Sequence, residues 1–259
     1  MKQKSKRKKH FLLGGILLLF LAGLLSQAFS YWPSVMASVS VMLGKEMPIY
    51  SVDTDKKQIA LSFDAAWGDK DTAKILEILK KHNVKVTFFM TGGWVDSFPE
   101  NVKMIAAEGH DLGNHSENHK EMSKLTEEEI REEVQSVHKK VKELTGVEMS
   151  LFRAPYGDYD DKLVTTVNSL GYQCILWNVD SLDWKDYGVD SIIKTVCNHK
   201  NLANGSIILM HNGATYTAEA LESVITGLEA QGYELVPISQ LLHSGEATVD
   251  PTGKQIPKT

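Results

Sequence analysis

The sequence predicts an α/β fold, a distorted (β/α) barrel with seven or eight parallel strands. From Ile59 onward, short apolar runs alternate with stretches that carry apolar residues at helical spacing. Each predicted strand is followed by a helix or a long loop, and strict alternation of this kind is typical of parallel strands. Seven such units fit a barrel better than an open sheet, and a doubly wound sheet is the alternative.

Seven short apolar runs are the predicted strands. The first is a short apolar run, a candidate for a buried strand. The seven strands span Ile59–Phe63, Val84–Met90, His110–Asn114, Met149–Arg153, Tyr172–Trp177, Gly205–Met210 and Tyr233–Pro237.

Helical patterns separate these strands. Thr126-x-x-Glu129 is a capping box, which marks the start of a helix, and Gly146 stops that helix. Asn83 can close the first helix in the left-handed conformation. The predicted helices span Asp71–His82, Pro99 to Gly109, Thr126 to Gly146, Asp160–Leu170, Val189–His199 and Thr217–Gln231.

Residues 1–29 combine a basic cluster with an apolar segment, a pattern typical of membrane targeting. The apolar run extends from Phe11 to Leu25, or to Phe29, whereas a helix that spans a bilayer needs about 20 residues. No clear cleavage site follows, so we expect an uncleaved membrane anchor, with a cleaved signal peptide and a secreted protein as the alternative. The basic cluster places the N-terminus in the cytoplasm and the rest of the chain outside.

The remaining chain divides into a linker, one globular domain and a tail. We expect a linker at residues 30–55 and the domain at residues 56–243. Residues 244–259 carry Gly, Pro, Thr and Lys without periodicity, so we expect a disordered tail there. Cys174 and Cys197 form no C-x-x-C motif; two free thiols are favoured over a disulfide, because a domain of this size needs no covalent staple.

The charge of the chain argues against nucleic acid as a partner. The formal net charge is −5, and without the six cations among the first nine residues the remainder carries about −11. Such a surface repels phosphates, on which affinity for DNA and RNA depends. A neutral or amine-bearing partner suits it better.

Polar side chains follow five of the predicted strands. In parallel α/β folds, sites form at the carboxyl ends of the strands, so these side chains are expected on one rim. Each alone could be a cap, a surface ion pair or a hydrogen-bonded histidine, but five together indicate a functional site. They are Asp64, His115 with His119, Arg153, Asp180 with Asp183, and His211.

His115-Ser-Glu-Asn-His119 is the candidate metal site. Histidines at positions i and i+4 can point the same way if the segment is helical, and two imidazoles suit zinc or another divalent first-row ion. The alternative is a pair of surface histidines.

The other rim residues suit acid–base chemistry. His211 is placed for general acid–base work, and Asp183 could orient it and raise its pKa. Asp64 could take a proton from water, with Arg153 keeping it ionised. Together with a metal, these roles describe hydrolysis in which water attacks a carbonyl.

Five ordered motifs resemble those of the polysaccharide deacetylases of carbohydrate esterase family 4, the NodB-homology family. The likeness covers roughly residues 59–242, nearly the whole globular part. The motifs are Ser62-Phe-Asp64, His115-Ser-x-x-His119, Arg153-Ala-Pro-Tyr-Gly157, Asp180-Ser-Leu-Asp183-Trp184 and Leu209-Met-His211.

The resemblance implies a distorted (β/α) barrel that removes acetyl groups from N-acetylated amino sugars of a cell-wall glycan. By this likeness Asp64 is the base and His211 the acid, Asp183 tunes His211, and Arg153 supports Asp64. A divalent metal, with zinc as the first choice, would be held by His115 and His119. The substrate-binding residues would be Tyr156, whose backbone NH helps to hold the oxyanion, and Trp184 with Leu209, which line the sugar and acetyl-methyl pockets.

One position departs from the family pattern. The first motif usually has a second aspartate that binds the metal, and here that position is Ala65. Phe63-Asp-Ala-Ala-Trp-Gly68 resembles a subgroup from endospore-forming bacteria, which implies a role in spore-wall maturation. Two main readings follow: an active deacetylase in which Asp69 or a water replaces the missing ligand, or a catalytically silent glycan-binding domain. A metal-free scaffold for wall-assembly partners is a third.

Overall fold

The computed structural model describes residues 46–258. The predicted membrane segment at residues 1–29 and most of the predicted linker lie outside the described residues. Within residues 46–258, no helix has the length and apolar character needed to cross a membrane.

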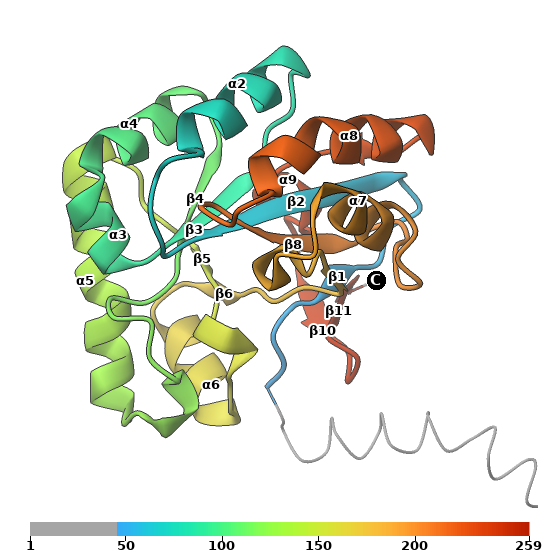
Figure 1. Cartoon of the computed structure of the whole chain (residues 1–259). Helices are drawn as coiled ribbons and strands as arrows, with labels where there is room; N and C mark the ends of the chain where they lie inside the picture. Colours follow the sequence, from blue (N-terminus) through green and yellow to red (C-terminus); the bar gives the residue numbers. More distant parts are fainter. Residues whose placement is uncertain (1–45, 259) are drawn as a thin grey trace, which may run out of the picture. The chain divides into compact units, whose positions relative to one another are not determined.

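Within the described residues, eight parallel strands form one sheet, which is strongly curved (Figure 1). The central strand β2 lies between β3 and β8, and the order across the sheet is β6-β5-β4-β3-β2-β8-β7, with β9 pairing with the start of β2. The prediction of parallel strands in an α/β fold is confirmed. The strands span β2 Gln58–Ala65, β3 Thr87–Met90, β4 Asp111–Asn114, β5 Leu151–Phe152, β6 Gln173–Cys174, β7 Val179–Asp180, β8 Ile207–His211 and β9 Glu234–Leu235.

The sheet is an incomplete barrel. Its two edge strands, β6 and β7, follow one another in the chain, so one extended segment pairs with β5 through its first half and with β8 through its second half. A single strand was expected at residues 172–177; β7 is an additional strand that the sequence pattern does not predict, because only two residues pair with β8 there.

Helices follow the strands and cover the outer face of the sheet (Figure 1). The expected capping box is present: the Thr126 hydroxyl accepts from the Glu129 N–H, and the Glu129 carboxylate accepts from the Thr126 N–H. Asn83 has a φ of 53° and closes the first helix, as expected. The helices span α2 Thr72–Lys81, α3 Gly92–Ser97, α4 Pro99–Ala107, α5 Glu127–Thr145, α6 Asp161–Ser169, α7 Val189–Cys197, α8 Thr217–Ala230 and α9 Ile238–Leu241.

Side chains of β2 alternate between two environments. Ile59, Leu61, Phe63 and Ala65 belong to the large apolar core beneath the helices. Ala60 belongs to a second, smaller core inside the curved sheet. Because successive side chains of a strand point to opposite faces, Ser62 and Asp64 share the inner face with Ala60. This alternation directs Asp64 into the interior of the curved sheet.

The prediction of a disordered tail is wrong. Residues 244–259 contain β10 (Ala247–Val249) and β11 (Lys254–Pro257), which pair antiparallel. β11 also pairs parallel with β1 (Ser51–Val52), at the end of the segment expected to be a linker. The missed signal is the turn at Asp250–Gly253, where Asp250 accepts from the N–H groups of Thr252 and Lys254.

Cys174 and Cys197 are both free, as the sequence favoured. Burial raises the pKa of the Cys174 thiol to about 12 and also raises the pKa of Cys197. Both side chains therefore act as packing groups rather than as nucleophiles.

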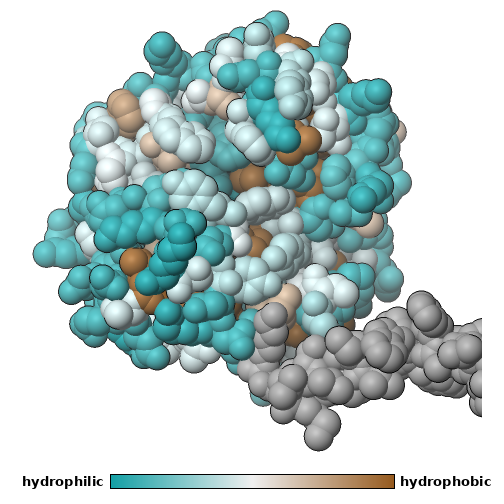
Figure 2. Space-filling model, turned by 60° about the horizontal axis from the view of Figure 1, so that its bottom comes forward, coloured by the Kyte–Doolittle hydropathy of each residue, from teal (hydrophilic) through white to brown (hydrophobic). Residues whose placement is uncertain are grey.

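The face of the molecule drawn in Figure 2 is largely hydrophilic, and its paler and hydrophobic residues gather near the middle.

Candidate active site

The carboxyl ends of four strands converge on a cavity of about 470 Å³. Asp64 of β2 and His211 of β8 are direct neighbours in the parallel register, and His115 follows the last residue of β4. The residues that line the cavity are Asp64, Trp67, His115, His119, Tyr156, Trp177, Asp180, Trp184, Leu209 and His211. The structure therefore brings most of the residues expected on the rim to one cavity, with Arg153 and Asp183 directly behind it.

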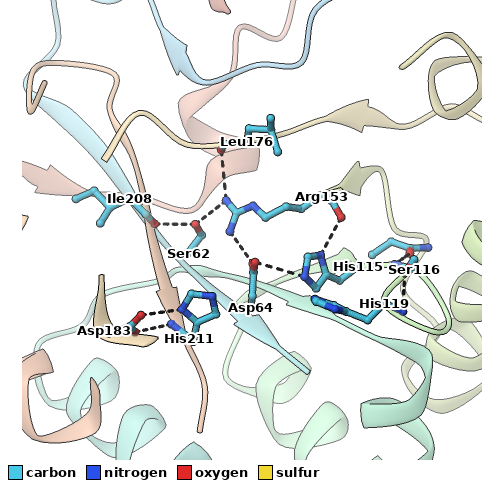
Figure 3. Close-up of polar contacts among 11 residues, drawn as sticks. Ser62, Asp64, His115, Ser116, His119, Arg153, Leu176, Asp183, Ile208 and His211 are labelled. Atoms are coloured by element: carbon cyan, nitrogen blue, oxygen red, sulfur yellow. Dashed lines mark hydrogen bonds and ion pairs between the residues drawn. The ribbon is translucent and has the colours of Figure 1, made fainter. Parts of the chain in front are cut away.

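Asp64 is held by a buried ion pair (Figure 3). Nη1 of Arg153 donates to Oδ1 of Asp64 at 2.7 Å, and Nη2 donates to the Ser62 hydroxyl at 2.7 Å. Burial favours the neutral acid, but the Arg153 guanidinium outweighs it and lowers the pKa of Asp64 below its ordinary value. Asp64 is therefore an ionised carboxylate at neutral pH, with Oδ2 left for another partner.

Arg153 is completely buried and has an aromatic environment. Its guanidinium lies 4.0 Å from the centre of the Phe89 ring and 5.6 Å from that of Trp177. Ser62 relays the network to the backbone, since its hydroxyl donates to the Ile208 carbonyl at 2.7 Å. The pair is thus fixed by β2, β5 and β8 together.

His211 is oriented by a second carboxylate (Figure 3). Nδ1 of His211 lies 2.7 Å from Oδ1 of Asp183, and the His211 backbone N–H donates to Oδ2 of Asp183 at 2.7 Å. The Thr217 hydroxyl also donates to Oδ2, at 2.6 Å. Burial opposes the charged imidazole, but Asp183 outweighs it and raises the pKa of His211. Because Nδ1 faces a carboxylate, Nε2 is the atom available to a substrate.

His115 and His119 meet at their ring edges, with centroids 4.9 Å apart. Nδ1 of His115 faces the Arg153 carbonyl at 2.8 Å and so carries the proton, which leaves Nε2 unprotonated, 3.4 Å from Oδ2 of Asp64. Burial lowers the pKa of His115 to about 4 and lowers the pKa of His119 as well. Both imidazoles are neutral at pH 7, the form that binds metal ions.

The segment between these histidines is a tight loop and not the helix considered from the spacing. Ser116 and His119 have φ values of 64° and 53°. The buried Glu133 carboxylate of α5 accepts from the backbone and side-chain N–H groups of Asn118, both at 2.8 Å, and pairs with Lys120 at 2.8 Å. A helix next to the site therefore holds the loop in this left-handed conformation.

The residues present do not make up a three-ligand metal site. Within residues 46–258, no three His, Cys, Asp or Glu side chains are grouped so that they could hold an ion. Ala65, where the family pattern has an aspartate, is fully buried in the apolar core. Asp69, considered as a substitute, instead accepts from Asn101 of α4 at 3.1 Å and does not line the cavity. Hydrolytic zinc sites typically have three protein ligands, and here only two imidazoles are in place.

The expected sugar-contacting residues all line the cavity. Tyr156 is 68% exposed, has a φ of 60° and places its ring 4.6 Å from that of His119. Trp184 is 53% exposed, whereas Leu209 is buried in the cavity wall. Trp67 and Trp177 also line the cavity and were not assigned to the site from the sequence. The available signal for Trp67 was its place two residues after the end of the strand that carries Asp64.

Comparison with known proteins identifies the family of this chain. The family model described as "Polysaccharide deacetylase" matches residues 51–175. The chain is 34% identical over 222 residues to the peptidoglycan-N-acetylmuramic acid deacetylase PdaA of Bacillus subtilis, an alignment that covers 83% of this chain and 82% of PdaA. This chain belongs to the polysaccharide deacetylase family. The resemblance seen in the five motifs is thereby confirmed.

Other proteins are similar to this chain to a comparable extent. YlxY of Bacillus subtilis, an uncharacterised protein, is 36% identical over 195 residues, and the match covers 75% of this chain but only 60% of YlxY. The solved structure of BA3943, described as a CE4 family pseudoenzyme from Bacillus anthracis, has a TM-score of 0.72 and 36% identity, covering 75% of this chain and 68% of that one. A BA3943 mutant of the same TM-score is described as having restored enzymatic activity. The family thus includes deacetylases and a pseudoenzyme at similar identity to this chain.

Proposed function

We propose that this protein removes acetyl groups from N-acetylated amino sugars of a cell-wall polysaccharide, such as peptidoglycan or a chitin-like glycan. The observation that carries the proposal is the pairing of Asp64 with His211 at one cavity. Asp64 is kept ionised by Arg153 and His211 is oriented by Asp183, and the two functional groups come from adjacent strands. The pKa of Asp64 is lowered and that of His211 is raised, so one group can accept a proton while the other donates one. General acid–base catalysis needs such a pair at one site.

The proposed reaction is hydrolysis of an amide. Asp64 accepts a proton from a water molecule as its oxygen attacks the acetyl carbonyl. His211, protonated on Nε2, gives a proton to the nitrogen as the C–N bond breaks, which leaves acetate and the amino sugar. The backbone N–H of Tyr156 is proposed to stabilise the oxyanion, with Trp184 and Leu209 against the sugar and the acetyl methyl group.

A catalytically silent glycan-binding domain is the second candidate. Ala65 favours it, because the usual third metal ligand is missing, and so does the similarity to a CE4 family pseudoenzyme. The complete acid–base network favours the active enzyme, since Arg153 and Asp183 serve proton transfer more directly than sugar binding.

Acetate release decides between the two candidates. The full-length protein is incubated with chitotetraose and with peptidoglycan, with and without added zinc, and acetate is measured. We expect release by the parent and a loss of about 100-fold or more in both Asp64→Asn and His211→Ala. Lys80→Gln, which changes an exposed residue on α2, is the matched control and keeps the parent's rate. Binding of the glycan without acetate release by the parent would favour the silent domain instead.

We also propose that residues 1–29 anchor the domain on the outer side of the cell membrane. The basic cluster followed by an apolar run supports this topology. Protease added to intact protoplasts is then expected to remove the domain, and full protection until lysis would contradict the proposal. The Phe63–Gly68 sequence further suggests a role in the spore wall. Expression of the protein that begins only at sporulation would support this role.

A further inference from the structure

Trp67 holds a position in the cavity that the acid–base assignments do not use. Its ring centre lies 5.5 Å from that of His211 and 5.8 Å from that of His119. The indole therefore spans the distance between the proposed acid and one of the two candidate metal ligands. Yet 51% of the residue is exposed, so its outer face remains open to a ligand.

The backbone that carries Trp67 is fixed from several sides. The Gly68 carbonyl accepts from the indole N–H of Trp94 at 2.7 Å and from the side chain of Asn212 at 3.3 Å. Asn212 is itself fully buried and bonded to Thr72 of α2 at 2.9 Å. Such anchoring fixes the backbone from which the half-exposed indole extends towards His119 and His211.

A close backbone approach adds to this anchoring. Gly213 has a φ of 92°, and a Cβ at that position would lie 2.3 Å from the Trp67 carbonyl oxygen. Only glycine allows the segment after His211 to pack directly on the turn that carries Trp67. The turn after β2 and the turn after β8 are therefore fixed to each other.

Three large aromatic side chains are exposed at this one cavity. Trp67, Tyr156 and Trp184 are each more than half exposed, line the same cavity and follow three different strands. Aromatic rings bury a large area with little loss of conformational freedom, and they suit ligands that have one apolar face and polar edges. An amino-sugar ring with its acetyl group is such a ligand.

We propose that Trp67 is a specificity-determining residue that packs against the sugar carrying the reacting acetamide and confines it between His119 and His211. This inference rests on the proposed function for the class of ligand, but it concerns binding and does not depend on turnover. An indole fixed across both imidazoles limits the cavity to one orientation of the sugar ring. Its loss is expected to weaken binding and to relax the orientation of the acetamide.

Binding of chitotetraose by calorimetry tests the proposal in the full-length protein. We expect Trp67→Ala to weaken binding at least about fivefold and Trp67→Phe to recover part of that loss, because phenylalanine restores an aromatic face. Tyr187→Ala is the matched control, since Tyr187 is 67% exposed but does not line the cavity. Thermal unfolding of each variant shows that the fold is kept, and Trp67→Phe serves if the alanine variant does not fold.

The outcomes separate this proposal from the proposed function. If the parent binds chitotetraose without releasing acetate, the enzymatic role fails, while a fivefold loss in Trp67→Ala still supports the role of Trp67. If acetate is released but Trp67→Ala and Tyr187→Ala both bind and react like the parent, the role of Trp67 is overturned. If Trp67 only packs against His211, Trp67→Ala should alter the pKa of His211 and leave the affinity for chitotetraose unchanged. That result would also overturn the proposed role of Trp67 in sugar binding. A parent that does not bind the oligosaccharide overturns both.

Discussion

Arg153, which directly follows β5, and Asp64 of β2 form a buried ion pair, 2.7 Å between Nη1 and Oδ1, across the interior of the curved sheet. Little solvent reaches these charges to replace a lost partner, because Arg153 is 0% exposed and Asp64, at the cavity wall, is 4% exposed. Removing one partner of a buried pair leaves the other charge uncompensated, which usually costs more than the pair itself contributes.

We expect Arg153→Leu to lower the free energy of unfolding by about 3–5 kcal/mol, because it leaves the Asp64 carboxylate buried without a partner. The double variant Arg153→Leu with Asp64→Asn should be less destabilised than the sum of its single variants, since both charges are gone. Urea unfolding measures all three. The exposed Lys80–Glu108 pair is the control, and Lys80→Gln should leave stability unchanged. Strict additivity in the double variant would contradict the coupling.

The Asp183–His211 pair gives a pH-dependent prediction. Asp183 raises the pKa of His211, so the folded state holds this proton more firmly than the unfolded chain does. The resulting stability is fully present below the unfolded pKa of histidine, about 6.5, and is lost as pH rises through the higher folded value. NMR titration of His211 should show the raised pKa, and Asp183→Asn should lower it.

His110 provides the internal reference for that titration. It is buried just before β4, where its Nδ1 accepts from the Val86 N–H at 3.2 Å, and burial lowers its pKa to about 4. Asp183→Asn should leave the titration of His110 unchanged. A His211 pKa that is the same in the parent and in Asp183→Asn would contradict the assigned orientation.

Ala65→Asp tests the metal site. Ala65 pairs with Met90 of β3, whose carbonyl accepts from the His115 N–H, so position 65 is one strand away from His115. We expect the aspartate to tighten zinc binding at least tenfold, a gain of about 1.4 kcal/mol. Without zinc the same variant should be less stable than the parent, because it buries a carboxylate in an apolar core.

Calorimetric titration of zinc into the metal-free parent and variant measures the difference. Ala66→Asp is the matched control: it adds the same charge one residue further on, at a partly exposed position. If the parent already binds zinc as tightly as Ala65→Asp, the two imidazoles have another partner and the argument from Ala65 fails.

Glu133 is expected to be essential for the loop that carries His119. In Glu133→Gln one carboxylate oxygen becomes an amide that donates, and it then faces the N–H groups of Asn118 or the Lys120 ammonium. The loss should be about 1.5–3 kcal/mol of unfolding free energy, together with a changed His119 signal in NMR spectra. Glu132→Gln, the exposed neighbour on α5, should change neither. Equal stability of the two variants would show that the loop is held by other contacts.

The strand-by-strand alternation made much of the fold and the site predictable. Asp64, Arg153 and His211 could be placed on one rim because each lies at the end of an apolar run. In a parallel sheet the carboxyl ends of all strands lie at the same edge. The capping box at Thr126 fixed one helix start from local chemistry alone. These are features in which neighbouring residues decide the structure.

Pairing between distant segments could not be predicted in this way. β7 and β10 are only two and three residues long, and β10 has no apolar run to mark it. These short strands are stabilised by partners far along the chain, such as β8 for β7. The hydrophobic periodicity of a short sequence segment carries no information about such distant partners. Trp67 was missed for a related reason, because its significance lies in contacts with His119 and His211 rather than in its own motif.

The pairing of β1 with β11 constrains the order in which the chain can fold. Ser51–Val52 leave the ribosome before any other strand of the described chain, and their partner Lys254–Pro257 leaves it last. Until that partner arrives, the Val52 N–H can pair with the Gly205 carbonyl, but the backbone groups of β1 that face β11 remain open to other chains. The domain therefore reaches its final contacts only after synthesis of its last strand. A chain truncated before Lys254 would keep its proposed catalytic residues but lack the β11 partner of its first strand.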